Sequence, residues 1–224
     1  MRPVQIIAPL AAVTIGWAAL AALASWAPPA VAADTPVRIV ALGDSLTAGF
    51  GLAREAAFPA RLEAALKARG LAVEVTNAGV SGDTASGGLA RLDWSVPEGT
   101  HAVIVELGAN DALRGVEPAV TRSALDAILR RLGERKIAVL LAGMRAPPNM
   151  GADYVRAFDA IFPALAAAHD VVFDPFFLDG VAADRALNQS DGLHPTARGV
   201  DAIVRRILPK AEELVARVKA KQAP

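Results

Sequence analysis

The sequence places a carboxylate three residues before a histidine near its C-terminal end, in the segment Asp-Gly-Leu-His-Pro at residues 191–195. Pro195 disfavours a helical conformation at His194, so this pair is expected on a loop. One turn can then direct Asp191 to Nδ1 of His194 and leave Nε2 free for a serine hydroxyl, which is the arrangement that makes a histidine a general base. A metal site is the weaker interpretation, because no second histidine stands at ligand spacing.

A serine suited to such a base is Ser45, in the segment Gly-Asp-Ser-Leu-Thr at residues 43–47. On a tight turn between a strand and a helix, a serine exposes its hydroxyl and points its backbone N–H into the same space, as suits a nucleophile that also stabilises an oxyanion. The alternative is that Asp44 and Ser45 only cap a helix. Thr47 excludes the Gly-x-Ser-x-Gly motif, and Arg54 at the third glycine position excludes a dinucleotide-binding motif.

Two further loops carry groups that could bind an oxyanion. The segment 77–84 holds Gly79 and Gly82, whose conformational freedom lets a backbone N–H approach a ligand. Asn110 follows an apolar run and could donate its side-chain amide to a developing negative charge. Such an asparagine can equally be a turn or cap residue. Asp111, next to it, is expected to cap or brace the loop.

The composition narrows the chemistry that these residues could perform. The 224 residues include no cysteine, which excludes disulfides, thiolate metal sites and a cysteine nucleophile. Lysine and arginine total 23, as do aspartate and glutamate, so the net charge of zero gives no basic surface for nucleic acid. Of the three histidines, His101 precedes a predicted strand and His169 ends a predicted helix, so both are interpreted as structural.

The elements that must position these residues alternate along the chain. Short apolar runs predict five strands, at residues 37–42, 73–75, 102–107, 137–142 and 171–173. Periodic apolar positions predict helices around residues 58–66, 125–132 and 154–168, and a last helix from residue 200 that Pro209 breaks or kinks. Strands separated by helices need right-handed crossovers, so we expect one α/β domain at residues 34–224, a three-layer α/β/α sandwich with a mostly parallel sheet. Ligands of such sheets bind beyond the carboxyl ends of the strands, where the loops described above begin.

The first 33 residues have a different character from the rest. Residues 3–33 carry no charged side chain, and the apolar stretch at 6–26 is followed by prolines and small residues. This pattern predicts a signal peptide at residues 1–33, cleaved after Ala32 or Ala33, and therefore a periplasmic or secreted protein. An uncleaved membrane anchor is the alternative, because about 20 apolar residues can span a bilayer.

In their order along the chain, these segments resemble the SGNH (GDSL) hydrolase family over essentially the whole mature chain. The matching blocks are residues 43–46, the Gly82 loop, residues 108–111 and residues 191–195. The resemblance implies a flavodoxin-like fold with Ser45 as nucleophile, His194 as base and Asp191 as the residue that orients it.

The same resemblance implies an oxyanion hole. Its donors would be the Ser45 N–H, the Gly82 N–H and the Asn110 side chain, with Gly79 as the rival of Gly82 for the backbone position. Leu113 and Val116, after Asn110, are candidates to close over an acyl chain.

Within the family, residues 105–108, 113–115 and 174–178 are most similar to exported bacterial arylesterases, acyl-CoA thioesterases and lysophospholipases. The implied substrate is a small-molecule acyl ester or thioester, and the implied mechanism needs no metal or organic cofactor. Polysaccharide acetyl-esterases of the same family are the nearest alternative. A non-catalytic exported α/β protein that binds an anion is a hypothesis of another class, although it gives His194 no role. We expect a monomer without stable membrane insertion once the leader is removed.

Overall fold

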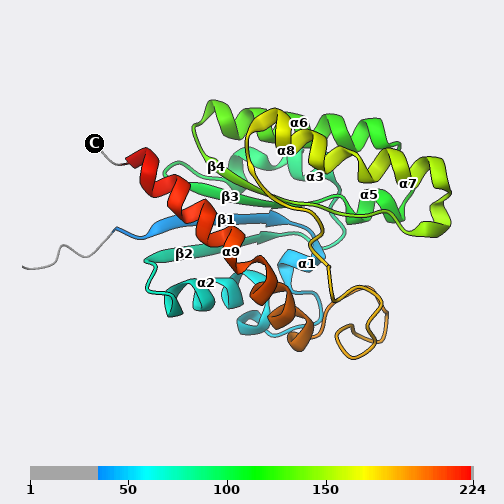
Figure 1. Cartoon of the computed structure of the whole chain (residues 1–224), viewed down its shortest axis with the longest axis horizontal. Coiled ribbons are helices and arrows are strands. Elements are labelled where there is room, and N and C mark those ends of the chain that lie inside the picture. The colour runs from blue at the N-terminus through cyan, green and yellow to red at the C-terminus, as the bar shows by residue number, and fades with distance from the viewer. Residues whose placement is uncertain (1–34, 223–224) are drawn as a thin grey trace, which may run out of the picture. The chain divides into compact units, whose positions relative to one another are not determined.

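Five parallel strands form the centre of the structure, a computed structural model that describes residues 35–222 (Figure 1). The predicted signal peptide at residues 1–33 lies outside the described residues. Within the described part, the sheet has the order β2-β1-β3-β4-β5 and every pair of neighbours is parallel. The strands are β1 (Val37–Gly43), β2 (Val73–Gly79), β3 (Ala102–Glu106), β4 (Ala138–Ala142) and β5 (Val172–Asp174).

Helices cover both faces of this sheet, which makes the three-layer α/β/α sandwich that the sequence predicts. The α-helices are α1 (Ser45–Ala48), α2 (Phe58–Ala68), α3 (Ala85–Ala90), α4 (Leu92–Ser95), α5 (Ala109–Leu113), α6 (Pro118–Glu134), α7 (Ala152–Asp159), α8 (Ile161–His169) and α9 (Ala197–Gln222). Two 3-10 turns are η1 (Arg54–Ala56) and η2 (Pro148–Met150). Helices α2 and α9 pack together on one face, and α3, α6 and α8 lie on the other (Figure 1).

The inner strands are apolar because both faces of the sheet are covered there. All residues of β3 and β4 are buried, and the apolar stripe of α6 that begins at Leu125 and Ile128 is buried as well. A parallel sheet with helices on both sides leaves no face for water, so its strands read as continuous apolar runs rather than alternating ones. This burial explains why apolar runs predicted β1, β3 and β4, whereas the edge strand β2 is buried only at Val73 and only its first three residues were predicted.

One helical prediction differs from the structure, and of the two outcomes expected at Pro209, a break or a kink, the break does not occur. The helix expected over residues 154–168 is divided into α7 and α8 at Ala160. Pro163 accounts for the division, because a proline has no N–H to donate to the carbonyl four residues earlier, that of Asp159. Prolines are tolerated in the first turn of a helix, which is where Pro163 stands in α8.

Pro209 does not end the last helix. Helix α9 runs without a break from Ala197 to Gln222 with Pro209 inside it. Buried side chains flank the proline on both sides, Ile207 before it and Ala211 and Leu214 after it. We attribute the continuity to this packing, which offsets the cost of the missing hydrogen bond.

The carboxyl ends of the strands lie at one edge of the sheet. Gly43 of β1 is in register with Gly79 of β2 and with Glu106 of β3, and Glu106 is in turn in register with Ala142 of β4. The loops that follow these residues therefore begin side by side, and they carry the residues of the candidate site.

Candidate active site

Ser45 is the first residue of α1, directly after the end of β1. The Asp44 side chain caps this short helix by accepting the Leu46 N–H at 2.9 Å, so Asp44 can be a helix cap while Ser45, which is largely buried, lines a cavity. The turn needs a glycine before it, because a Cβ on Gly43 would lie 2.1 Å from Thr47 Oγ1. The local sequence thus forces a sharp change of direction that places Ser45 on the cavity described below.

His194 and Asp191 lie beside this serine. Nε2 of His194 is 2.9 Å from Ser45 Oγ, and Nδ1 is 2.6 Å from Asp191 Oδ2. The other carboxylate oxygen, Oδ1, accepts the backbone N–H groups of Leu193 at 2.9 Å and of His194 at 3.0 Å. The Asp191 side chain therefore organises its own loop and holds the Nδ1 edge of the imidazole.

The carboxylate of Asp191 stays ionised over the whole neutral range. The His194 backbone N–H, the His194 side chain and the Leu193 N–H lower the pKa of Asp191 to about 2. An ionised carboxylate on Nδ1 favours the tautomer whose Nε2 can accept a proton from Ser45.

Asn110 approaches the same serine from α5. Gly108, in a left-handed conformation with φ of 118°, precedes that helix, and Asn110 Nδ2 donates to Asp44 Oδ2 at 3.0 Å. Asp111 accepts the Ala85 N–H at 2.9 Å and the Thr121 hydroxyl at 3.0 Å. Asp111 is thus a brace between helices, as predicted, while the Asn110 amide faces the site.

The loop that contains Gly82 is tied to the end of β1 and to α5. Val80 donates its N–H to the Gly43 carbonyl at 3.0 Å, and Arg114 donates to the Gly82 carbonyl at 2.8 Å. The Gly79 N–H already donates to Asn77 Oδ1 at 2.9 Å. Because this bond already occupies the Gly79 N–H, Gly82 is favoured over Gly79 as the backbone donor to a ligand.

Beneath the serine turn lies a buried carboxyl group that the sequence analysis did not single out. Glu106 ends β3 and is fully buried, and Thr47 Oγ1 donates to its Oε2 at 2.6 Å. Burial, with the Asp44 carboxylate nearby, raises the pKa of Glu106 well above its ordinary value. Burial also raises the pKa of Asp44 to about 6, although the Leu46 N–H and the Asn110 amide lower it. In the sequence, Glu106 could have been noticed because it is a single charged residue within an apolar run.

Ser45, Asn110 and His194 open into a largely apolar cavity of about 350 Å³. Leu113 lines this cavity, but Val116 and Gly82 are not among the residues on its wall. Most of the remaining wall was not predicted from the sequence. It comes from the loops after β4 and β5 and includes Met144, Arg145, Pro147, Pro148, Phe176 and Leu178. The Arg145 guanidinium lies 5.0 Å from the centre of the Phe176 ring.

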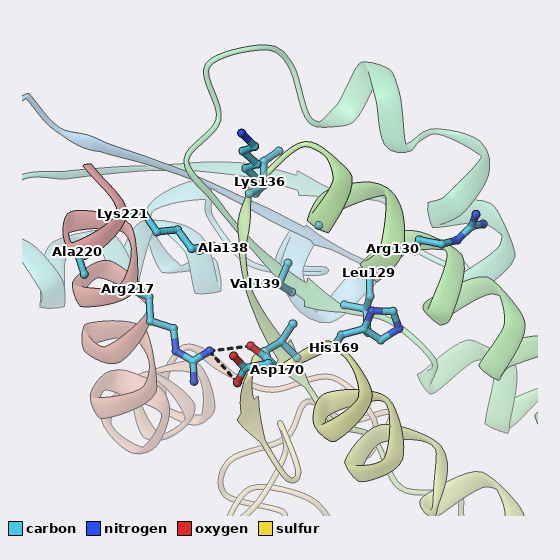
Figure 2. Close-up of a pocket in the computed structure, with 13 residues that line it drawn as sticks. Leu129, Arg130, Lys136, Ala138, Val139, His169, Asp170, Arg217, Ala220 and Lys221 are labelled. Carbon is cyan, nitrogen blue, oxygen red and sulfur yellow. Dashed lines mark hydrogen bonds and ion pairs between the residues drawn. The ribbon is translucent and has the colours of Figure 1, made fainter. Parts of the chain in front are cut away.

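A second cavity, of about 600 Å³, has charged residues such as Lys136 and Asp170 on its wall. Figure 2 shows the residues that line it. This cavity lies at the amino ends of β4 and β5, where Lys136 and Asp170 line it, and Arg217 of α9 donates to the Asp170 carbonyl at 2.7 Å. As far as the described residues go, its lining holds no serine or threonine. His169 reaches this cavity but is bonded to Asp126 at 2.7 Å, which fits a structural role.

His101 also fits the structural role predicted for it. Its Nδ1 accepts the Arg38 N–H at 3.0 Å, at the amino end of the sheet. Among residues 35–222, no group of three or more histidine, aspartate or glutamate side chains is placed to hold a metal ion.

A serine hydroxyl bonded to an imidazole, itself bonded to a carboxylate beside an apolar cavity, is a geometry suited to acyl transfer on an α/β/α scaffold. The family follows from comparison with known proteins: a model of the GDSL-like Lipase/Acylhydrolase family matches residues 41–202, and the chain belongs to this family. This finding confirms the resemblance inferred from the sequence.

Similar proteins narrow the class of reaction. The chain is 36% identical over 178 residues to "Esterase TesA" of Pseudomonas aeruginosa, covering 79% of this chain and 89% of that protein. It is 41% identical over 167 residues to "Thioesterase 1/protease 1/lysophospholipase L1" of Escherichia coli K12, covering 74% and 77%. The crystal structure of AlinE4, an SGNH-hydrolase family esterase, matches with a TM-score of 0.68 and 46% identity, covering 84% of this chain and 97% of that one. The chain is a carboxylic ester hydrolase.

Proposed function

We propose that the chain hydrolyses acyl esters or thioesters through an acyl-enzyme on Ser45. The observation that carries this proposal is the pair of contacts of His194, at 2.9 Å to Ser45 Oγ and 2.6 Å to Asp191 Oδ2. In this mechanism His194 accepts the serine proton as Oγ attacks the acyl carbon, and Asp191 stabilises the imidazolium that forms.

The oxyanion of the tetrahedral intermediate needs donors that are in place before the reaction. We assign this role to the Ser45 N–H, the Gly82 N–H and the Asn110 side chain. When the intermediate collapses, His194 gives its proton to the leaving alcohol or thiol. Water then attacks the acyl-enzyme by the same route, and neither a metal nor an organic cofactor is needed.

The shape of the cavity supports an acyl chain as the group held next to Ser45. Its wall is largely apolar, with Leu113, Met144 and Leu178 among the lining residues, and burial of methylene groups against such a wall is favourable. An acetylated polysaccharide would present hydroxyl groups there instead. This difference favours arylesterase, thioesterase or lysophospholipase activity over the acetyl-esterase alternative.

Covalent labelling with a fluorophosphonate tests the nucleophile. The wild-type protein should be labelled on Ser45, and Ser45→Ala should lose both labelling and turnover, with kcat lower by about 10⁴-fold to 10⁶-fold. Ser86→Ala, which removes an exposed hydroxyl on α3, is the matched control and should keep both. Unchanged turnover in Ser45→Ala would refute the mechanism. A protein with neither turnover nor labelling would fit the anion-binding alternative.

A substrate panel tests the leaving group and the acyl chain. Acyl esters from C2 to C16, an acyl thioester, a lysophospholipid and an acetylated polysaccharide should be compared by kcat/KM. We expect the acyl esters or thioesters to exceed the polysaccharide. A preference for the polysaccharide would favour the acetyl-esterase alternative.

We also propose that the protein acts outside the cytoplasm, on the basis of the predicted leader at residues 1–33. Within the described residues, no helix has the length and apolar character to cross a membrane. A monomer remains our expectation for the mature chain.

A further inference from the structure

Phe50 is a large apolar side chain that remains half exposed, with 50% of its surface accessible, five residues after the proposed nucleophile. Helix α1 ends at Ala48 and is capped by Gly49, which has the left-handed φ of 81°. The N–H groups of Gly49 and Phe50 both donate to the Ser45 carbonyl at 3.1 Å. The backbone of Phe50 is therefore held by Ser45, the residue whose hydroxyl is the proposed nucleophile.

The Phe50 ring lies against the imidazole of His194. The two ring centres are 4.5 Å apart and the planes are tilted by 35°. The face of an aromatic ring attracts a cation within about 6 Å of its centre. In the proposed mechanism the imidazole becomes a cation only as Ser45 loses its proton, so the attraction is stronger in the transition state than in the resting enzyme.

Gln189 connects the backbone beside the phenyl ring to the backbone beside the imidazole. Its side-chain Nε2 donates to the Phe50 carbonyl at 2.7 Å and to the Pro195 carbonyl at 3.0 Å. Its own N–H donates to the His194 carbonyl at 2.7 Å. Gly51 leaves room for this connection, because a Cβ there would lie 2.4 Å from Gln189 Oε1.

We propose that Phe50 is a positioning residue for His194, held in place by Gln189. Its ring covers one side of the imidazole, keeps Nε2 directed at Ser45 Oγ and stabilises the imidazolium that forms during attack. Phe50 is not among the residues that line the apolar cavity, so its effect is exerted on the base and not on the acyl chain. This inference rests on the proposed function, in which His194 is the base.

The test compares Phe50→Leu with Phe50→Tyr on a short acyl ester. Leucine keeps an apolar side chain but has no aromatic face, so kcat should fall by about 2-fold to 5-fold with KM nearly unchanged. Tyrosine keeps the face and should restore kcat. Trp94→Leu, which removes a more exposed aromatic side chain on α4, is the matched control and should behave as the wild type. Urea midpoints establish that each variant is folded.

Gln189→Ala provides an independent variant. It should lower kcat in the same direction, and the double variant with Phe50→Leu should lose less than the product of the two single losses, because both changes act on the position of one imidazole. Fully multiplicative losses would contradict the connection through Gln189. An effect confined to KM in Phe50→Leu, or kcat equal to that of the wild type, would overturn the role of the ring.

A spectroscopic measurement separates this inference from the proposed function. The His194 ring protons should change their NMR shifts in Phe50→Leu, because the ring current of the neighbouring phenyl group is lost, while those of His101 and His169 stay in place. Unmoved His194 resonances would overturn the contact itself. If Ser45→Ala retains turnover, the proposed function fails whatever the resonances show. If Ser45→Ala is inactive and Phe50→Leu is as fast as the wild type, the inference about Phe50 fails alone.

Discussion

Asn110 is held in position before any substrate arrives, because its side-chain amide donates to the Asp44 carboxylate at 3.0 Å. Such preorganisation is what makes an oxyanion donor effective. Asn110→Ala should therefore lower kcat by about 10²-fold to 10³-fold with KM close to the wild-type value. Steady-state kinetics on one ester, with a urea midpoint for each protein, provides the measurement.

The structural alternative for Asn110 predicts a different pair of results. A residue that only braces the start of α5 would cost about 1 kcal/mol of stability and leave kcat per folded molecule unchanged. A lower urea midpoint together with wild-type kcat would thus exclude Asn110 from the oxyanion hole.

The raised pKa of Glu106 predicts how the free energy of unfolding depends on pH. Because its pKa in the folded protein is raised above the ordinary value of 4.5, the folded state binds a proton that the unfolded state releases. The free energy of unfolding should therefore fall as pH rises above about 4.5. Glu106→Gln keeps the shape without the charge, so its decline over this range should be smaller than that of the wild type.

Urea unfolding at intervals from pH 4 to pH 8 measures this difference. Asp44 contributes a decline of its own between its ordinary pKa of 3.8 and its folded value of about 6, which both proteins share to a first approximation. Parallel curves for the wild type and Glu106→Gln would show that folding does not raise the pKa of Glu106.

Residue types and spacing predicted those parts of the site that are local in sequence. The Asp191–His194 contact spans three residues and the Asp44 cap spans two, so each can be inferred from a short segment. The contacts of Phe50 with His194 and of Thr47 with Glu106 join distant segments. They depend on strand register and loop path, which a single sequence does not specify.

At the scale of elements, α5 joins the proposed oxyanion donor to the wall of the cavity. It carries Asn110 near its start and Leu113 at its end, and Leu113 lines the cavity. Leu113→Ala should therefore reduce kcat/KM more for a long acyl ester than for an acetate. Each lost methylene contact is worth up to about 0.8 kcal/mol, or about four-fold in kcat/KM.

Val116→Ala is the matched control, because Val116 follows the same helix but does not line the cavity. We expect it to change kcat/KM to the same extent for C2 and C12 esters. Equal losses for both esters in Leu113→Ala would show that this helix does not contact the acyl chain.

Helices and strands could be predicted from the sequence where burial alone determines which residues form them. The buried runs of β3 and β4 identify strands without any knowledge of their neighbours. The division between α7 and α8 depended on Pro163, a residue that fits the apolar pattern but lacks an N–H. The continuity of α9 past Pro209 depended on packing of both halves of the helix against the rest of the fold, and such tertiary packing overrides local propensity.

For the whole molecule, the leader is the prediction to test. If residues 1–33 are a signal peptide, the protein recovered from the periplasm or medium of a producing cell should begin at Ala33 or Asp34. N-terminal sequencing or intact mass gives the answer. Recovery of the full-length chain from the membrane fraction would favour the uncleaved anchor instead.

Because a chain is synthesised from its N-terminus, Ser45 is made well before His194. These residues are 149 positions apart, and His194 lies three residues before α9, the last helix to be made. A nascent chain can contain the serine turn and all five strands of the described sheet while it still lacks His194. In the proposed mechanism, a chain that ends before residue 194 has the nucleophile but no base, so we expect ester hydrolysis only once synthesis has passed His194.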